Sequence, residues 1–142
     1  MAQIVLENEP EAETRAAILE GLIAHNAAGT GGEYALPRPI SLSVRDETTG
    51  KALGGLTARI SYSRMFIELL YIPPEQRGTG IGRQLMEKAE DVAREAGCIG
   101  IWIDTFSFQA PEFYRKLGYV EFGVLNDYPP GHSRHFLHKT LS

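Results

Sequence analysis

The sequence predicts an α+β domain built around a mixed β-sheet. Two nearly continuous apolar runs, MFIELLYI (65–72) and IGIWID (99–104), are typical of strands covered on both faces. A helical pattern lies between them, and antiparallel strand segments flank this strand–helix–strand unit on both sides. The chain has 142 residues, enough to bury one core, and we therefore expect a single domain over residues 1–142.

The N-terminal part is predicted to form a strand, a helix and a loop. QIVLE (3–7) favours a short strand. From Glu11 to about Asn26, apolar residues recur at helical spacing, which predicts an amphipathic helix facing a core. These apolar residues are Ile18, Leu19, Leu22 and Ile23. Residues 27–39 contain three glycines and two prolines, which predict a loop.

The other elements flank the central unit. ISLSVR (40–45) and KALGGLTAR (51–59), separated by a polar turn, predict a β-hairpin. APEFYRKLG (110–118) fits a short helix closed by its final glycine. YVEFGVL (119–125) and SRHFLHKTL (133–141) predict the last two strands.

The central helix has the clearest pattern in the chain. Its apolar residues recur at steps of three and four, and Gly97 follows at the position where helices commonly stop. The apolar positions are Ile81, Leu85, Ala89, Val92, Ala93 and Ala96.

Composition excludes several classes of protein. The formal net charge is −4, which argues against nucleic acid as a partner and permits a cationic substrate. Cys98 is the only cysteine, so an internal disulfide cannot form and a reducing compartment is expected. The N-terminus lacks a signal-peptide pattern, and no apolar run is long enough for a membrane span. We expect a cytoplasmic protein with no membrane partner.

Three histidines near the C-terminus, His132, His135 and His138, suggest a metal cluster at first sight. Residues three apart in a strand face opposite sides, so these side chains would not converge. No metal is expected.

The stretch EQRGTGIGRQ (75–84) follows a buried strand and opens the central helix. The first N–H groups of a helix lack intrahelical partners and lie at the positive end of its dipole. Glycines let an anion approach these amides, and Arg77 and Arg83 flank the loop. The spacing lacks the Gly-Lys-Ser/Thr of a P-loop and the third glycine of the dinucleotide fingerprint. The remaining alternatives are a turn without a ligand and a cradle for another phosphate.

The segment IELLYIPPEQRGTGIGRQLMEKAEDVAREAGC resembles the central motif of the GNAT superfamily of acyl-CoA-dependent N-acetyltransferases, and APEFYRKLGYVEFG resembles a second family motif. The resemblance covers residues 40–125 and implies a three-layer GNAT-like fold. Its central sheet is mixed and largely antiparallel, with helices on both faces and a splayed cleft for acetyl-CoA. It implies that the loop binds the coenzyme A pyrophosphate through Arg77, Gly78, Thr79, Gly80, Ile81, Gly82 and Arg83.

Two side chains are candidates for the chemistry of acetyl transfer. Glu68 is the only charged residue in its apolar strand and stands nine positions before Arg77, where family members that acetylate small amines carry an acidic residue. Such a carboxylate serves as a base, as an anchor for the substrate ammonium, or as a paired structural residue. Tyr114 stands four residues before Gly118, at the position of the family's thiolate-protonating tyrosine; packing of the helix on the sheet is its structural alternative.

The resemblance also implies contacts to the pantetheine arm. The backbone N–H groups of Leu70, Tyr71 and Ile72 would pair with the arm and polarise the thioester carbonyl. Ala110 fits the family pattern, whereas Ser107 stands where the family often has asparagine. A hydroxyl can make a similar hydrogen bond but has a shorter reach.

Candidates for acceptor binding come from strand ends and loops: Asn26, Asp104, Tyr128 and His132. Asp104 ends its predicted strand, and the ends of strands line the ligand crevice of open sheets.

The sequence therefore predicts an acetyl-CoA-dependent N-acetyltransferase that acts on a primary amine by direct transfer in a ternary complex. A small-molecule amine is favoured over a peptide amine, and a homodimer is compatible with the sequence although no residue indicates one. The alternative is an inactive acyl-CoA-binding or interaction module with the same fold.

Overall fold

The computed structural model describes residues 1–32 and 36–142, which belong to two compact units, Met1–Leu36 and Pro37–Ser142. The first unit contains helix α1 (Ala12–Thr30). Its start is held by Glu7, whose carboxylate accepts hydrogen bonds from the Glu11 N–H (2.9 Å) and the Thr14 hydroxyl (2.7 Å). Gly31 ends the helix in the left-handed conformation, with φ of 70°.

Two predictions for this unit are wrong. Residues 3–7 form no strand, because the described residues of this unit, 1–32 and 36, contain no second strand with which their backbone could pair. The helix runs through Gly29 to Thr30, beyond the predicted end at Asn26, and none of its residues is buried. Part of the predicted 27–39 loop, residues 33–35, lies outside the described residues.

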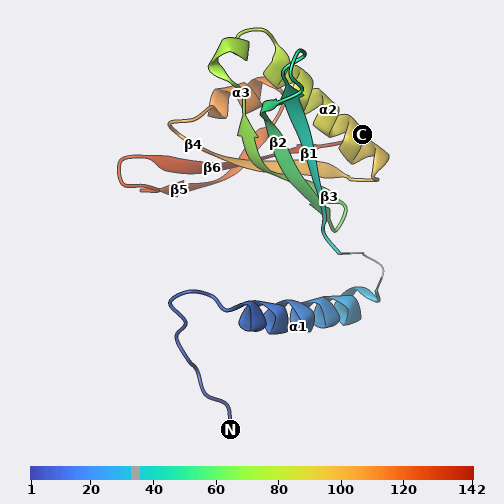
Figure 1. Ribbon diagram of the computed structural model, residues 1–142, viewed down its shortest axis with the longest axis vertical. Coiled ribbons are helices and arrows are strands. Elements are labelled where there is room, and N and C mark those ends of the chain that lie inside the picture. Colours follow the sequence, from blue (N-terminus) through green and yellow to red (C-terminus); the bar gives the residue numbers. More distant parts are fainter. Residues whose placement is uncertain (33–35) are drawn as a thin grey trace. The chain divides into compact units, whose positions relative to one another are not determined.

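The second unit is a six-stranded mixed sheet with the strand order β1-β2-β3-β4-β6-β5 (Figure 1). All neighbouring pairs are antiparallel except β3 and β4, which are joined through α2 and run parallel. The strands are β1 (Arg38–Arg45), β2 (Ala52–Ser61), β3 (Arg64–Tyr71), β4 (Gly100–Phe106), β5 (Val120–Asn126) and β6 (Ser133–Thr140). The helices are α2 (Ile81–Glu95) and α3 (Pro111–Lys116), with a 3-10 turn at Pro74–Gln76.

Both helices of this unit cover the same face of the sheet. Lys139 of β6 pairs with Glu90 of α2 (2.9 Å), and His135, four residues earlier on the same face of β6, contacts Glu121, which in turn pairs with Arg115 of α3. The core lies between this face and the helices and contains Met65, Met86, Ala89, Ile101, Ile103 and Leu137. Cys98 belongs to the same core, where burial raises the pKa of its thiol.

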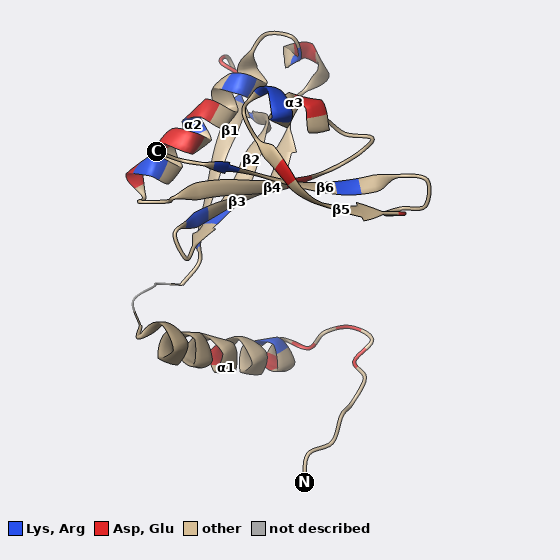
Figure 2. Ribbon diagram, turned by 180° about the vertical axis from the view of Figure 1, so that it is seen from behind, with Lys and Arg blue, Asp and Glu red and all other residues tan. Residues whose placement is uncertain are grey.

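Helix α2 carries charges of both signs along its length (Figure 2). Arg83 pairs with Glu87 (3.1 Å) and Arg94 with Asp91 (3.5 Å). Such exposed pairs add little to stability, but they give the helix a solvated face opposite its buried one. None of the described helices is long and apolar enough to cross a membrane.

The strands β3 and β4 separate part-way along their length. Their pairing runs from Arg64 opposite Gly100 to Ile67 opposite Ile103 and stops there. On the other side of β3, the register against β2 shifts at Thr57/Ala58, so Glu68 has no partner in the ladder. From Glu68 to Tyr71, β3 therefore has no backbone partner in β4, and a cleft opens between the two strands.

Candidate active site

The cleft between β3 and β4 is the mouth of a cavity of about 1200 Å³. Its walls are the separated ends of the two strands, the loop before α2, the start of α2, and α3 with the loop before it. Most of the predicted site residues line it: Glu68, Leu70, Tyr71, Ile72, Arg77, Gly78, Gly80, Ile81, Gly82, Arg83, Asp104, Ala110 and Tyr114. Each lining residue comes from the unit 37–142.

The start of α2 presents backbone N–H groups to this cavity. Gly80 precedes the helix with φ of 86°, and the first helical hydrogen bond runs from the Gln84 N–H to the Gly80 carbonyl. The N–H groups before Gln84 therefore lack helical partners. A Cβ atom at Gly78 or Gly80 would meet no atom within 4 Å, so open space lies over the loop. This cradle fits a phosphate-sized anion.

Gly82 has a different role in the loop. A Cβ atom there would lie 3.3 Å from the ring of Phe113, so the first turn of α2 packs closely against α3. A side chain at this position would require the Phe113 ring to shift by a few tenths of an ångström, and the close approach of Gly82 ties the anion cradle to the helix that carries Tyr114.

The side chains around the loop are held by local contacts. Arg77 Nε donates to the Ile72 carbonyl (3.0 Å), and its guanidinium lies 5.9 Å from the centre of the Tyr71 ring. Arg83 is exposed and paired with Glu87. The Thr79 hydroxyl donates to the Gln76 carbonyl (2.5 Å), and Thr79 does not belong to the cavity lining. The backbone of the loop thus faces the cavity, with arginine charge at both ends.

Glu68 stands at the mouth of the cavity, in the bulge of β3. Its carboxylate pairs with Arg59 Nη1 at 3.3 Å, and its side chain is 36% exposed. A carboxylate in an apolar strand is costly unless it has a cationic partner or faces a cleft open to solvent, and Glu68 has both.

Tyr114 lies deep in the same cavity. It is 7% exposed and packs edge-to-face on Phe113 and Tyr119. Burial, with a smaller contribution from the negative charge of Asp104, raises the pKa of the Tyr114 phenol to about 12. The side chain therefore holds its proton at every pH near neutrality.

Arg134 is a cavity residue that the sequence analysis missed. Its Nη2 pairs with the Asp104 carboxylate at 2.8 Å, and its Nη1 donates to the Tyr128 hydroxyl at 3.1 Å. The guanidinium also stands 5.2 to 5.3 Å from the ring centres of Phe106, Tyr128 and Phe136. Nε is buried and has no hydrogen-bond partner in the part of the chain that the structure describes. The pairing of β4 with β6 places Arg134 opposite Phe106, two residues from Asp104 and on the same face of the sheet, and the sequence carried no signal of this register.

The remaining predicted residues lie outside the lining. Ser107 links β4 to β6, since its hydroxyl accepts from the Ser133 N–H (3.0 Å). Tyr128 and His132 contact lining residues without lining the cavity themselves. The Tyr128 hydroxyl accepts a hydrogen bond from Arg134, and the His132 ring centre lies 5.1 Å from that of Phe108. Asn26 belongs to α1, in the other unit, where its carbonyl accepts from the Thr30 hydroxyl (2.8 Å).

The described residues contain no group of three or more His, Cys, Asp or Glu that could hold a metal ion. The cavity itself presents a carboxylate, a protonated phenol, an arginine–aspartate pair and a helix start.

Comparison with known proteins identifies the family. The model of the acetyltransferase (GNAT) family matches residues 6–119. The chain belongs to the GNAT family. It is therefore an acetyl-CoA-dependent acetyltransferase, and the resemblance of its glycine loop and of the segment at Tyr114 is confirmed at the level of the family.

Three relatives of this GNAT chain cover most of its length. A blasticidin-S acetyltransferase from Streptomyces morookaense is 41% identical over 93 residues, which are 65% of this chain and 68% of the relative. An acetyltransferase of Agrobacterium fabrum is 32% identical over 95% of this chain and 96% of its own. The crystal structure of an acetyltransferase from Bacillus cereus is 37% identical, covers 96% of this chain and 98% of its own, and has a TM-score of 0.84.

Proposed function

We propose that this GNAT enzyme acetylates a primary amine by direct transfer from acetyl-CoA in a ternary complex. The observation that carries the proposal is the cavity itself, because one continuous space joins the anion cradle, Glu68 and Tyr114. A donor bound at the cradle and an acceptor entering beside Glu68 can meet in that space without a covalent enzyme intermediate.

The donor would be held by the backbone. The pyrophosphate of coenzyme A fits the N–H groups of the loop and the start of α2, with Arg77 and Arg83 adding charge. The end of β3 and the residue after it, Leu70 to Ile72, have no partner in β4 and offer backbone groups to the pantetheine arm in the manner of an added strand. The same N–H groups would polarise the thioester carbonyl.

The reaction needs two proton movements. Glu68 first accepts a proton from the acceptor ammonium, directly or through a water molecule, and passes it to solvent. The neutral amine nitrogen then attacks the thioester carbon, an N–C bond forms, and the C–S bond breaks to leave the coenzyme A thiolate. The nitrogen loses its second proton through Tyr114, which gives its hydroxyl proton to the sulfur and takes the proton from the nitrogen in its place. With a pKa of about 12 it keeps that proton available throughout the pH range in which amines are acylated.

A small-molecule amine is the favoured acceptor. The relative named for blasticidin S supports this class. The acceptor end of the cavity carries Asp104 and Glu68, each already paired with an arginine, so it offers carboxylates for an ammonium without a large negative excess. Tyr128 and His132 would shape this end from behind Phe106 and Phe108.

The experiment measures thiol release from acetyl-CoA with a panel of small amines and N-terminal peptides, for the wild type, Glu68→Gln and Tyr114→Phe. We expect turnover with small amines, and a fall in kcat of about 100-fold in each variant with coenzyme A affinity unchanged. Tight coenzyme A binding without turnover on any amine or peptide would instead support an inactive binding module.

A further inference from the structure

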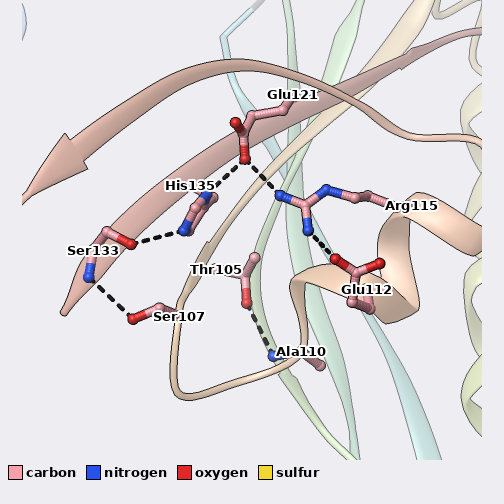
Figure 3. A network of polar contacts seen from close by, with 8 residues as sticks. All are labelled: Thr105, Ser107, Ala110, Glu112, Arg115, Glu121, Ser133 and His135. Carbon is pink, nitrogen blue, oxygen red and sulfur yellow. Dashed lines mark hydrogen bonds and ion pairs between the residues drawn. The ribbon is translucent and has the colours of Figure 1, made fainter.

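A chain of polar contacts links α3 to β5 and β6 beside the cavity (Figure 3). On α3, Arg115 Nη1 contacts Glu112, and Nη2 donates to Glu121 Oε1 on β5 at 2.8 Å. The same Glu121 oxygen accepts from His135 Nδ1 on β6 at 2.5 Å. His135 Nε2 lies 2.8 Å from the Ser133 hydroxyl. The proposed function uses none of these residues.

The chain continues to the loop before α3. The Ser133 N–H donates to the Ser107 hydroxyl (3.0 Å), and the Ser107 N–H donates to the Ser133 carbonyl (2.8 Å). The Ala110 N–H, at the start of α3, faces the Thr105 hydroxyl at 3.4 Å (Figure 3). The segment 107–116 is thus fastened to the sheet at both ends, and Tyr114 lies within it, adjacent to Arg115.

The contacts define the protons of the network. A carboxylate cannot donate, so His135 Nδ1 carries a proton toward Glu121, and the other ring nitrogen, Nε2, is engaged by the Ser133 hydroxyl. The hydrogen bond from His135 and, less strongly, that from Arg115 lower the pKa of the Glu121 carboxyl. Glu121 therefore remains a carboxylate at neutral pH and holds both partners.

The order Ser133–His135–Glu121 is that of a nucleophilic triad, but two observations point to another role. The Ser133 N–H already donates to Ser107 and is not free to stabilise an oxyanion. The three side chains also do not belong to the cavity lining, whereas Tyr114, beside Arg115, does.

We propose that Glu121, with His135 and Arg115, is a set of positioning residues that fixes the Tyr114 hydroxyl against the sulfur of coenzyme A. The inference rests on the proposed role of Tyr114. Helix α3 has only six residues, so its own hydrogen bonds do not hold it rigid. The Glu121 carboxylate joins α3 to two strands, and a displacement of Tyr114 by about 1 Å is enough to weaken transfer severely.

The test is a double-mutant cycle between Glu121→Gln and Tyr114→Phe, with thiol release measured on the amine that turns over fastest in the panel. If Glu121 acts through Tyr114, Glu121→Gln lowers kcat about tenfold in the wild type and less than twofold in the Tyr114→Phe background. Equal factors in the two backgrounds would mean a general structural role and would overturn the proposal.

A second measurement does not depend on the acceptor. In protein labelled with ¹³Cζ-tyrosine, the Tyr114 resonance is assigned by its loss in Tyr114→Phe and followed as coenzyme A is added. We expect Glu121→Gln to reduce the coenzyme-A-induced shift of this resonance by half or more, with the Kd for coenzyme A changed less than threefold. An unchanged shift overturns the proposal, and so does failure of the wild type to bind coenzyme A, which overturns the proposed function as well.

Two variants complete the set. Asp91→Asn is the control. Asp91 is an exposed carboxylate on α2 paired with an arginine three residues away, just as Glu112 is on α3. Its substitution should change neither kcat nor the Tyr114 resonance. Full kcat in Tyr114→Phe would remove the acid role itself, whereas full kcat in Glu121→Gln alone would remove only the positioning role.

Discussion

The two ends of the cavity are built in different ways. The donor end is made of backbone, with a loop of glycines and the N–H groups of α2. The acceptor end is made of side chains that hold one another, with Arg134 between Asp104, Tyr128 and three aromatic rings. A backbone cradle suits a donor that is always the same, and side chains can be replaced to suit different acceptors.

The acceptor end should show the largest effect of a single substitution. Arg134→Met leaves Asp104 without its cationic partner, and Asp104 is only 13% exposed. We expect a loss of about 2 kcal/mol in the free energy of unfolding, measured by urea denaturation, because an uncompensated buried charge is costly. The KM for the amine should rise several-fold while the Kd for coenzyme A stays within twofold.

The matched control is Arg45→Met. Arg45 is exposed and donates to the Ser43 hydroxyl and the Gly50 carbonyl at the far end of β1. Its loss should cost less than about 0.5 kcal/mol. An equal effect of the two substitutions would show that the acceptor end does not depend on the Arg134–Asp104 pair.

The donor end should respond to a change at the backbone. Gly80 has φ of 86° and lines the cavity, so Gly80→Ala introduces strain of about 1 kcal/mol and places a methyl group in the anion cradle. We expect the Kd for coenzyme A to rise about tenfold, as measured by calorimetry, with little change in acceptor selectivity.

Gly97 supplies a control of the same geometry. It has φ of 79°, and a Cβ atom there would also meet nothing within 4 Å, but it lies beyond the other end of α2. Gly97→Ala should cost similar stability and leave coenzyme A binding unchanged. If both variants weaken binding alike, the effect at Gly80 comes from strain and not from the cradle.

The same contrast explains what could be predicted from sequence. The donor end is local: its strand, glycines and helix follow one another between residues 65 and 96, so their order predicted a candidate anion cradle, and the family resemblance implied coenzyme A as its ligand. The strands and helices of the unit 37–142 were also predicted within about two residues, because their hydrophobic periods are clear. The Arg134–Asp104 pair depends on the pairing of β6 with β4, and the Glu121–His135 contact on the register of the β5–β6 pair with its bulge at Glu121/Gly123. Periodicity reveals neither which strands pair nor their register. The strand prediction for QIVLE (3–7) was wrong for a related reason, because an apolar stretch forms a strand only where a second strand can hydrogen-bond to its backbone.

Tyr114 lies between the two ends, and its burial gives an expected effect on stability that is confined to high pH. In the unfolded chain a tyrosine titrates near pH 10, whereas burial raises the pKa of Tyr114 to about 12 in the folded protein. The folded state therefore holds the phenolic proton over a range where the unfolded state loses it, and stability is complete below pH 10 and falls as the pH rises toward 12. At pH 11 this difference costs about 1.4 kcal/mol. Urea denaturation at pH 8 and pH 11 should show a smaller loss of stability in Tyr114→Phe than in the wild type.

Tyr119 supplies the control. Burial also raises the pKa of its phenol, so Tyr119→Phe should reduce the loss of stability at pH 11 in the same way. Tyr119 does not line the cavity, so this substitution should leave turnover intact. An identical profile for Tyr114→Phe and the wild type would mean that Tyr114 is solvated, which is incompatible with its place at the junction of the two ends.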